Sequence, residues 1–67
     1  MKTTIDNLTI GDTFYLLNKK GERKDKASTY IVVYLVECHM KYEKVENRNI
    51  RYQTHTDFNP CTVLKLN

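Results

Sequence analysis

The segment from Ser28 to Met40, STYIVVYLVECHM, is the most apolar part of the sequence and constrains the fold more than any other feature. Successive side chains of a β-strand point to opposite faces, so a strand at the surface of a small sheet should have one apolar face and one polar face. In this segment the face that carries Ile31, Val33 and Leu35 is apolar. The other face is also apolar, with Tyr30, Val32, Tyr34 and Val36. Either the chain itself or a partner must cover this second face.

Three explanations account for the second apolar face. A β-bulge would let the two halves of the strand bury side chains of opposite parity. Alternatively, apolar residues near the N-terminus would fold over this face as a lid; they are Ile5, Leu8 and Ile10. In the third explanation the face stays exposed as a patch of roughly 300 Å², a size at which exposed apolar surface indicates a binding site. The sequence leaves the three explanations open.

Residues that favour β-strands dominate the sequence, which has five Tyr and eight Thr but a single Ala. No helical period of useful length is present. We therefore predict five strands, at residues 13–17, 28–40, 41–46, 50–54 and 61–67. In the fourth of these strands Ile50 and Tyr52 should face inward. Before the first strand we expect an irregular segment or a single helical turn.

Polar segments mark the connections between the predicted strands. Residues 18–27 form a long loop, with its sharpest bend at Gly21. The sequence NRN at 47–49 predicts a turn, because Asn tolerates positive φ better than other non-glycine residues. The sequence DFNP at 57–60 predicts another turn, since a residue before proline is disfavoured in the helical region.

This layout predicts an all-β fold, a five-stranded antiparallel sheet that bends strongly or closes into a small barrel. Residues 1–67 would form a single domain. The layout resembles the SH3-like small barrels in three features: Gly11 and Asp12 lead into the first strand, a long loop follows it, and the last strand ends with VLKL. The resemblance implies a fold that hosts both protein-binding and nucleic-acid-binding functions.

The length of the chain argues against an enzyme. A domain of 67 residues buries only about 60% of the surface that its unfolded chain exposes, and its core supplies roughly 3–5 kcal/mol. Such a margin leaves little for a deep catalytic pocket. The sequence has no nucleophile elbow, phosphate-binding glycine loop or paired carboxylates, and its only glycines are Gly11 and Gly21. We predict a non-enzymatic protein without a cofactor.

Four residues have the side chains of a tetrahedral zinc site: Cys38, His39, His55 and Cys61. Cys38 and His39 are neighbours in the sequence, so on a strand they would point to opposite faces. No C-x-x-C or H-x-x-x-H pair is present. We therefore predict no metal site, and the common role of such a cysteine is a small apolar side chain in the core.

The N-terminal sequence MKTTIDNLTIGD lacks the apolar core of a secretory signal. No run approaches the roughly 18 apolar residues of a membrane span. We therefore expect a cytoplasmic protein that has reduced cysteines and no membrane partner.

The net charge of +3 arises from one loop, Lys19 to Lys26, in which five basic residues accompany two acidic ones. Its basic side chains are the candidate nucleic-acid-binding residues: Lys19, Lys20, Arg23, Lys24 and Lys26. Each could contact a phosphate and release a counterion, with tyrosines nearby as stacking platforms for bases. Alternatively, the loop is a solvated hairpin tip, since acidic residues alternate with the basic ones.

We predict foremost a small binding module that contacts a protein partner through Tyr30, Val32, Tyr34 and Val36, or through an exposed strand edge. The size and the Lys-, Asn-, Thr- and Tyr-rich composition resemble small accessory proteins of bacteriophages. That resemblance implies a modulator or inhibitor of a host protein. The alternatives are a nucleic-acid-binding module that uses the basic loop and a homodimer or other homo-oligomeric assembly component.

Overall fold

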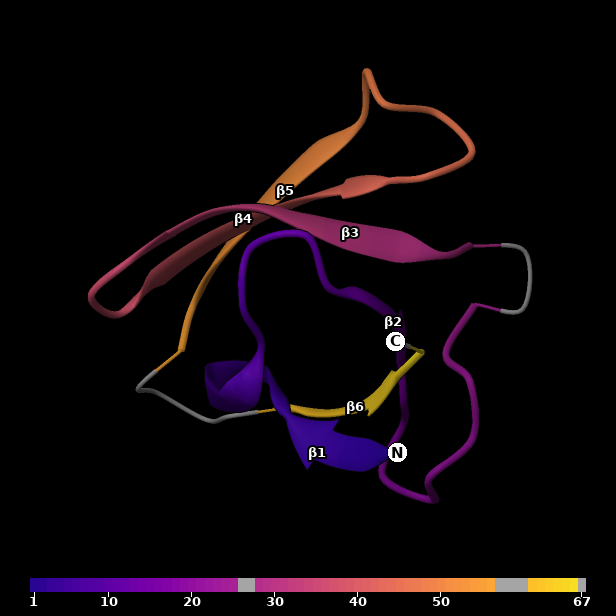
Figure 1. Cartoon of the computed structure of the whole chain (residues 1–67). Coiled ribbons are helices and arrows are strands. Elements are labelled where there is room, and N and C mark those ends of the chain that lie inside the picture. The colour runs from indigo at the N-terminus through magenta and orange to yellow at the C-terminus, as the bar shows by residue number, and fades with distance from the viewer. Residues whose placement is uncertain (26–27, 57–60, 67) are drawn as a thin grey trace.

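Six strands and one 3-10 helix make up the computed structural model, which describes residues 1–25, 28–56 and 61–66 (Figure 1). In chain order the elements are β1 (Lys2–Thr4), η1 (Ile5–Asn7), β2 (Thr13–Leu16), β3 (Tyr30–Val36), β4 (His39–Lys44), β5 (Arg51–His55) and β6 (Thr62–Lys65). They form one antiparallel sheet with the order β1-β6-β2-β3-β4-β5. No helix in this described part of the chain has the length and apolar character required to cross a membrane.

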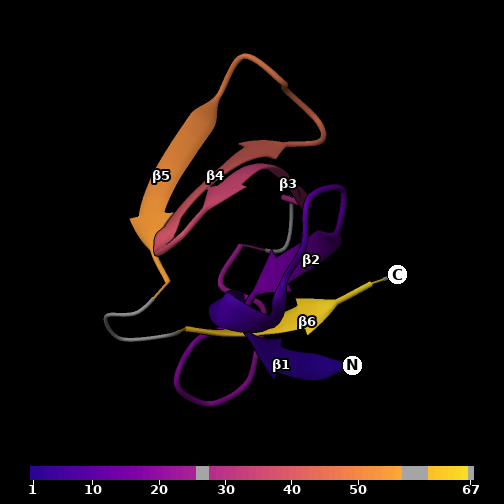
Figure 2. The ribbon, with the colours of Figure 1, turned by 60° about the vertical axis from the view of Figure 1, so that its left-hand side comes forward.

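The all-β antiparallel prediction is confirmed, but the prediction of a five-stranded barrel or strongly bent sheet is wrong. The sheet has six strands among the described residues and is neither closed nor strongly curled (Figure 2). The additional strand is β1, which pairs with β6 through Thr3 and Val63. It lies in the segment that was predicted to be irregular. Because β1 and β5 occupy opposite ends of the strand order, the resemblance to SH3-like barrels does not extend to closure.

The core lies on one face of the sheet. Phe14, Met40 and Val63 are completely buried at its centre. Four aromatic rings pack there with centroids 5.2–5.8 Å apart, those of Phe14, Tyr30, Tyr42 and Tyr52. Such spacings and the mixture of stacked and edge-to-face arrangements are favourable for aromatic pairs. The rings of β2, β3, β4 and β5 therefore form one continuous cluster.

A bulge divides β3 and accounts for its two apolar faces. Val32 pairs with Tyr42, whereas Tyr34 pairs with the adjacent Lys41, so Val33 is the extra residue. Before the bulge Tyr30 and Val32 are buried, with 5% and 1% of their surface exposed. The parity then changes: Leu35 packs against the core, while Tyr34 and Val36 are 42% and 49% exposed. The bulge explanation is confirmed.

The N-terminal segment contributes to the cover of the core, as the second explanation predicted in part. Ile5 in η1 and Leu8 after it are buried within the core cluster. Ile10 is not, since it is 63% exposed. The helical turn predicted in this segment is confirmed as η1.

Asp12 fixes the path from the N-terminal segment into β2. Its carboxylate accepts hydrogen bonds from the Thr9 N–H (2.8 Å) and hydroxyl (3.1 Å), and lies 3.5 Å from Lys65 Nζ. The bond from the backbone of Thr9 and the nearby charge of Lys65 lower the pKa of Asp12 despite its burial. The backbone of this turn also pairs with β3. The Val32 carbonyl accepts a hydrogen bond from the Gly11 N–H (2.9 Å), and the Val32 N–H donates one to the Asp12 carbonyl (3.0 Å), directly before the bulge.

The single strand predicted at 28–40 is instead a hairpin. β3 ends at Val36, the two residues Glu37 and Cys38 form the loop, and β4 begins at His39. Glu37 has a φ of 52°, the positive value typical of two-residue hairpin loops. The loop was missed because Glu and Cys are not residues that indicate such a turn.

The remaining connections agree with the sequence in part. The turn at 47–49 is confirmed by hydrogen bonds from the Asn47 N–H to the Lys44 carbonyl (3.2 Å) and from the Ile50 N–H to the Asn47 carbonyl (3.1 Å). Tyr52 packs against the core as predicted, whereas Ile50 is 36% exposed. The turn predicted at 57–60 lies outside the described residues.

Candidate functional site

The face of the β3–β4–β5 meander opposite the core, here called the outer face, has three cross-strand rows. The register aligns Val36 with His39 and His55 at one end, and Tyr34 with Lys41 and Gln53 in the middle. The third row contains Ile31, Glu43 and Arg51. Since residues directly opposite one another in an antiparallel pair share a face, these side chains form one surface.

The middle row combines an exposed aromatic ring with a cation. Lys41 Nζ lies 4.9 Å from the centroid of the Tyr34 ring, within the range of a cation–π interaction. Tyr34 and its neighbour Val36 are among the exposed large apolar residues of the chain. A tyrosine in such a position buries apolar area against a partner while its hydroxyl remains hydrated.

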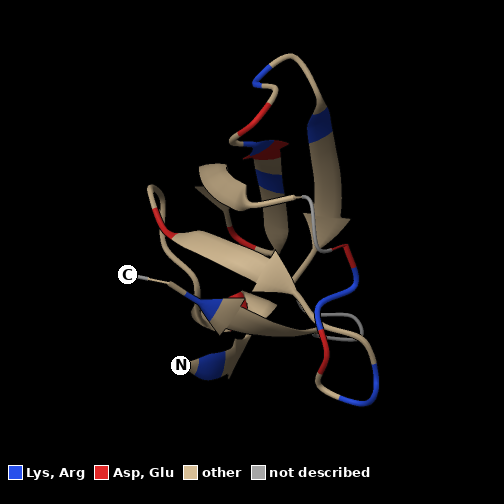
Figure 3. Ribbon diagram, turned by 90° about the vertical axis from the view of Figure 1, so that its right-hand side faces the viewer, with Lys and Arg blue, Asp and Glu red and all other residues tan. Residues whose placement is uncertain are grey.

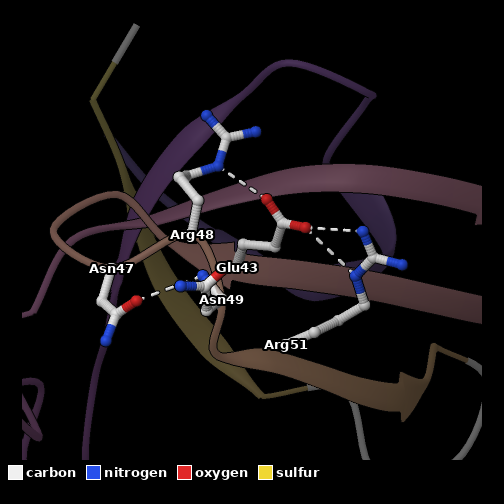
Figure 4. A network of polar contacts seen from close by, with 5 residues as sticks. All are labelled: Glu43, Asn47, Arg48, Asn49 and Arg51. Carbon is white, nitrogen blue, oxygen red and sulfur yellow. Dashed lines mark hydrogen bonds and ion pairs between the residues drawn. The ribbon is translucent and has the colours of Figure 1, made fainter.

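The third row contains a buried carboxylate held by two arginines (Figure 4). The carboxylate of Glu43, whose side chain is only 8% exposed, accepts a hydrogen bond from Arg48 Nε (2.6 Å) and two from Arg51 Nε and Nη2 (3.1 and 2.6 Å). These hydrogen bonds from Arg48 and Arg51 lower the pKa of Glu43. Two cations share one anion, so the group has a net positive charge. Both arginine side chains remain more than half exposed, at 58% and 57%.

β5 is an edge strand of the sheet, since it comes last in the strand order and no described strand lies on the side away from β4. Toward β4, the Lys44 N–H donates to the Ile50 carbonyl (3.3 Å) and the Thr56 N–H donates to the Cys38 carbonyl (2.7 Å). Backbone groups in an antiparallel ladder alternate in direction along the strand. Residues 50, 52, 54 and 56 therefore direct their backbone groups at β4, and Arg51 and Gln53 direct theirs away from it. This exposed edge adjoins the outer face (Figure 2).

The structure separates the four predicted protein-binding residues. Tyr30 and Val32 are core residues of the first half of β3, so they are not accessible to a partner of the folded chain. Tyr34 and Val36 lie on the outer face. The prediction of one docking face with all four residues is wrong, because the bulge at Val33 moves Tyr34 and Val36 to the face opposite Tyr30 and Val32.

Hydrogen bonds and a stacking contact within the chain hold the basic loop in a defined conformation. Asn18 Oδ1 accepts hydrogen bonds from the N–H groups of Lys20 (2.9 Å) and Glu22 (3.0 Å). The Arg23 guanidinium stacks 3.6 Å above the ring of Tyr15 and donates to the Ser28 carbonyl at 3.4 Å. Arg23 thus has a structural role within the chain.

The other predicted phosphate-binding residues of this loop are all lysines. Lys19, Lys20 and Lys24 are exposed, and Lys26 lies outside the described residues. Basic and acidic residues alternate along the loop (Figure 3). The structure therefore assembles three exposed lysines here, with acidic neighbours.

Three of the four residues with metal-binding side chains come together at the end of the outer face. The ligand atoms of Cys38, His39 and His55 all lie within 4.8 Å of one another. The prediction that Cys38 and His39 point to opposite faces is wrong, because Cys38 lies in the hairpin loop, where strand alternation does not hold. Cys61 does not belong to this cluster, and both cysteines are free thiols.

Comparison of the sequence with protein-family models, with curated proteins and with solved structures yielded no match.

The Glu43 network was not predicted from the sequence, and the predicted exposed strand edge was not assigned to β5. A turn centred on Asn47 places residues at equal distances on either side opposite each other. That symmetry pairs Glu43 with Arg51 and His39 with His55, as the structure has them. The turn predicted at 47–49 is centred on Arg48 and would instead have placed Glu43 opposite Gln53, so the observed register did not follow from that prediction.

Proposed function

We propose that the protein is a non-enzymatic binding module that captures an extended segment of another protein along the edge of β5. The observation that carries the proposal is that Arg51 and Gln53 direct their backbone groups away from β4, beside the exposed Tyr34 and Val36 of the outer face. Strand addition of this kind obtains affinity from main-chain hydrogen bonds and specificity from alternate side chains. The function needs no pocket.

The charges of the outer face favour an acidic partner segment. Among the described residues of the three rows and the Arg48 that binds them, Lys41, Arg48 and Arg51 are balanced by Glu43 alone. A strand that adds to β5 would place every second side chain on the outer face, beside Arg51, and the others on the core side, beside Tyr52. The partner segment we expect therefore alternates acidic and apolar residues. Its carboxylates would meet the exposed parts of the arginines.

A pair of substitutions at Gln53 tests strand addition directly. Gln53→Pro removes an N–H that points away from β4, so the ladder of the folded chain keeps its hydrogen bonds, and proline is tolerated on such an edge. Gln53→Ala shortens the same side chain but keeps the N–H. We expect proteins captured from nuclease-treated lysate by the wild type to be retained by Gln53→Ala and lost by Gln53→Pro, with thermal unfolding of both variants showing intact folds. Capture unaffected by Gln53→Pro would contradict the proposal.

The biological setting that we propose is the cytoplasm, with a host protein as the target of a phage-type modulator or inhibitor. This part of the proposal depends on the resemblance in size and composition to bacteriophage accessory proteins. It adds no residues to the site. Identification of the proteins captured in the Gln53 experiment tests it.

A nucleic-acid-binding function is the second candidate, and the exposure of Lys19, Lys20 and Lys24 favours it. Phosphate contacts predict binding that weakens steeply as salt rises. We expect, on this alternative, that replacing the three lysines with glutamine abolishes salt-sensitive binding to single-stranded or duplex DNA or RNA. A titration without any salt-sensitive binding would exclude it.

A homodimer is the third candidate, since the β5 edges of two copies could pair with each other. Sedimentation over a range of protein concentrations distinguishes self-association from capture of another protein. Gln53→Pro should dissociate such a dimer, while the lysine substitutions in the loop should leave it intact.

A further inference from the structure

We propose that Cys38, His39 and His55 form a binding site for a single zinc ion, or for another divalent transition metal of similar preference. The site lies where the β3–β4 loop meets the last residue of β5. It is independent of the protein-binding function proposed above, since it depends on side chains and not on the strand edge.

Strand pairing and a tight hairpin loop together bring these three residues to one place. His39 and His55 are a directly opposed cross-strand pair, and the hydrogen-bonding pattern makes theirs a non-hydrogen-bonded pair, the type in which side chains lie closest. Their rings lie 4.6 Å apart between centroids, at 86° to each other. Cys38 is brought beside them by the tight loop that begins at Glu37.

The backbone at the site is held in place on both strands. The Cys38 carbonyl accepts a hydrogen bond of 2.7 Å from the Thr56 N–H, which follows His55 directly. The loop and the end of β5 are thus joined next to all three ligands. Sites on strands and closed hairpins keep their ligands in place better than sites on long loops.

The spacing of the ligand atoms is close to that of a metal site. All three lie within 4.8 Å of one another, whereas Zn–S and Zn–N bonds of about 2.3 and 2.0–2.1 Å would place tetrahedral ligands roughly 3.3–3.6 Å apart. A contraction of about 1 Å lies within the reach of side-chain rotation without movement of the backbone. His39 and His55 are exposed and Cys38 is half-buried, so an ion can reach the site from solvent.

The chemistry of the ligands indicates which ion would bind. One thiolate and two imidazoles suit zinc and its soft or borderline neighbours, while calcium and magnesium prefer oxygen ligands. Three protein ligands leave a fourth tetrahedral position for water or for a group from a partner. The bound ion would connect the β3–β4 loop to β5 and stabilise the folded chain.

Titration of the full chain with Co²⁺, and competition by Zn²⁺, tests the site. We expect one equivalent of Co²⁺ to produce the visible bands of tetrahedral cobalt and a thiolate charge-transfer band, both abolished by excess Zn²⁺. Cys38→Ser should remove the charge-transfer band and weaken binding by more than about 100-fold, since loss of even an outer-shell partner costs roughly 10- to 100-fold. His39→Gln and His55→Gln should weaken binding similarly.

Cys61→Ser is the matched control, because Cys61 is an exposed free thiol outside the cluster. This variant should keep the wild-type spectrum and stoichiometry. Zn²⁺ should raise the thermal unfolding midpoint of the wild type and Cys61→Ser but not that of Cys38→Ser, whose circular dichroism spectrum without metal should match the wild type. A charge-transfer band that persists in Cys38→Ser, one that disappears in Cys61→Ser, or absence of saturable binding would overturn the proposal.

Discussion

The two halves of β3 have nearly the same composition and opposite roles. Tyr30 and Val32 precede the bulge and belong to the core, whereas Tyr34 and Val36 follow it and face solvent. One inserted residue, Val33, separates the two environments. The comparison shows that in a strand apolar throughout, burial depends on parity relative to the bulge and not on the hydrophobicity of each residue.

The largest expected effect is a contrast between the two tyrosines. Tyr30→Ala removes a ring from the aromatic cluster and should cost about 3–5 kcal/mol, as much as the roughly 3–5 kcal/mol that a core of this size supplies. We expect that variant to be unfolded by circular dichroism. Tyr34→Ala should cost less than about 1 kcal/mol in urea denaturation, because only an exposed cation–π contact is lost.

A graded version of the same contrast uses the valines and avoids complete unfolding. Val32→Ala should destabilise the protein by roughly 2 kcal/mol, and Val36→Ala by less than about 0.5 kcal/mol. Equal losses at the two positions would mean that the halves of β3 do not differ as described.

Alkaline pH should destabilise the core to which the first half of β3 belongs. Burial, aided by the neighbouring Tyr30 and Tyr52 phenols, raises the pKa of Tyr42, the partner of Val32, to about 12. Above pH 10, the ordinary tyrosine pKa of about 10, the unfolded chain loses this proton while the folded chain keeps it, so stability should fall as pH rises toward 12. Tyr42→Phe should reduce that dependence, as measured by urea denaturation between pH 8 and 11. An unchanged pH profile in Tyr42→Phe would show that Tyr42 does not cause it.

Deletion of Val33 tests the bulge itself. The remaining residues of β3 would then form a regular ladder, with Val32 still facing inward and Tyr34 outward. We expect the variant to fold and to lose about 1 kcal/mol, since one half-buried side chain disappears. Unfolding, or protection of Tyr34 from chemical modification, would contradict the assignment of Val33 as the extra residue.

The smallest expected effect concerns the loop after the exposed half of β3. Glu37 has a positive φ, which is unfavourable for a residue with a Cβ. Glu37→Gly relieves that cost but increases the entropy of the unfolded chain, so we expect a net stabilisation of about 0.5 kcal/mol, seen as a higher urea midpoint. Asn49→Gly, in the other turn of the meander, is the control and should give no stabilisation.

Much of the fold could be predicted because turn chemistry and alternation are local properties of the sequence. β2, β5 and β6 lie close to predicted ranges, and the turn at 47–49 is confirmed. β1 could not be predicted in this way. Its three residues, Lys2–Thr4, carry no apolar pattern and become a strand only by pairing with β6.

The position of the bulge and the cluster of Cys38, His39 and His55 could not be predicted from the sequence, for different physical reasons. In the sequence YIVVYLV every register gives an apolar face, so the pattern cannot show where a bulge lies. The cluster depends on Cys38 being in a loop, and Glu-Cys is an unusual loop sequence for a hairpin. Two residues of the outer face, Tyr34 and Val36, were therefore named from the sequence. Its charged residues Lys41, Glu43 and Arg51 were not.

The strand order also has a consequence for how the chain reaches its folded state. β3, β4 and β5 are joined by short connections, whereas β1 pairs with β6 from the far end of the sequence, with Thr3 opposite Val63. Contacts of low sequence separation form with the smaller loss of chain entropy. The meander should therefore be the folding nucleus, and β1 should dock last. In native-state hydrogen exchange, the amide of Thr3 should open at lower free energy than that of Tyr42.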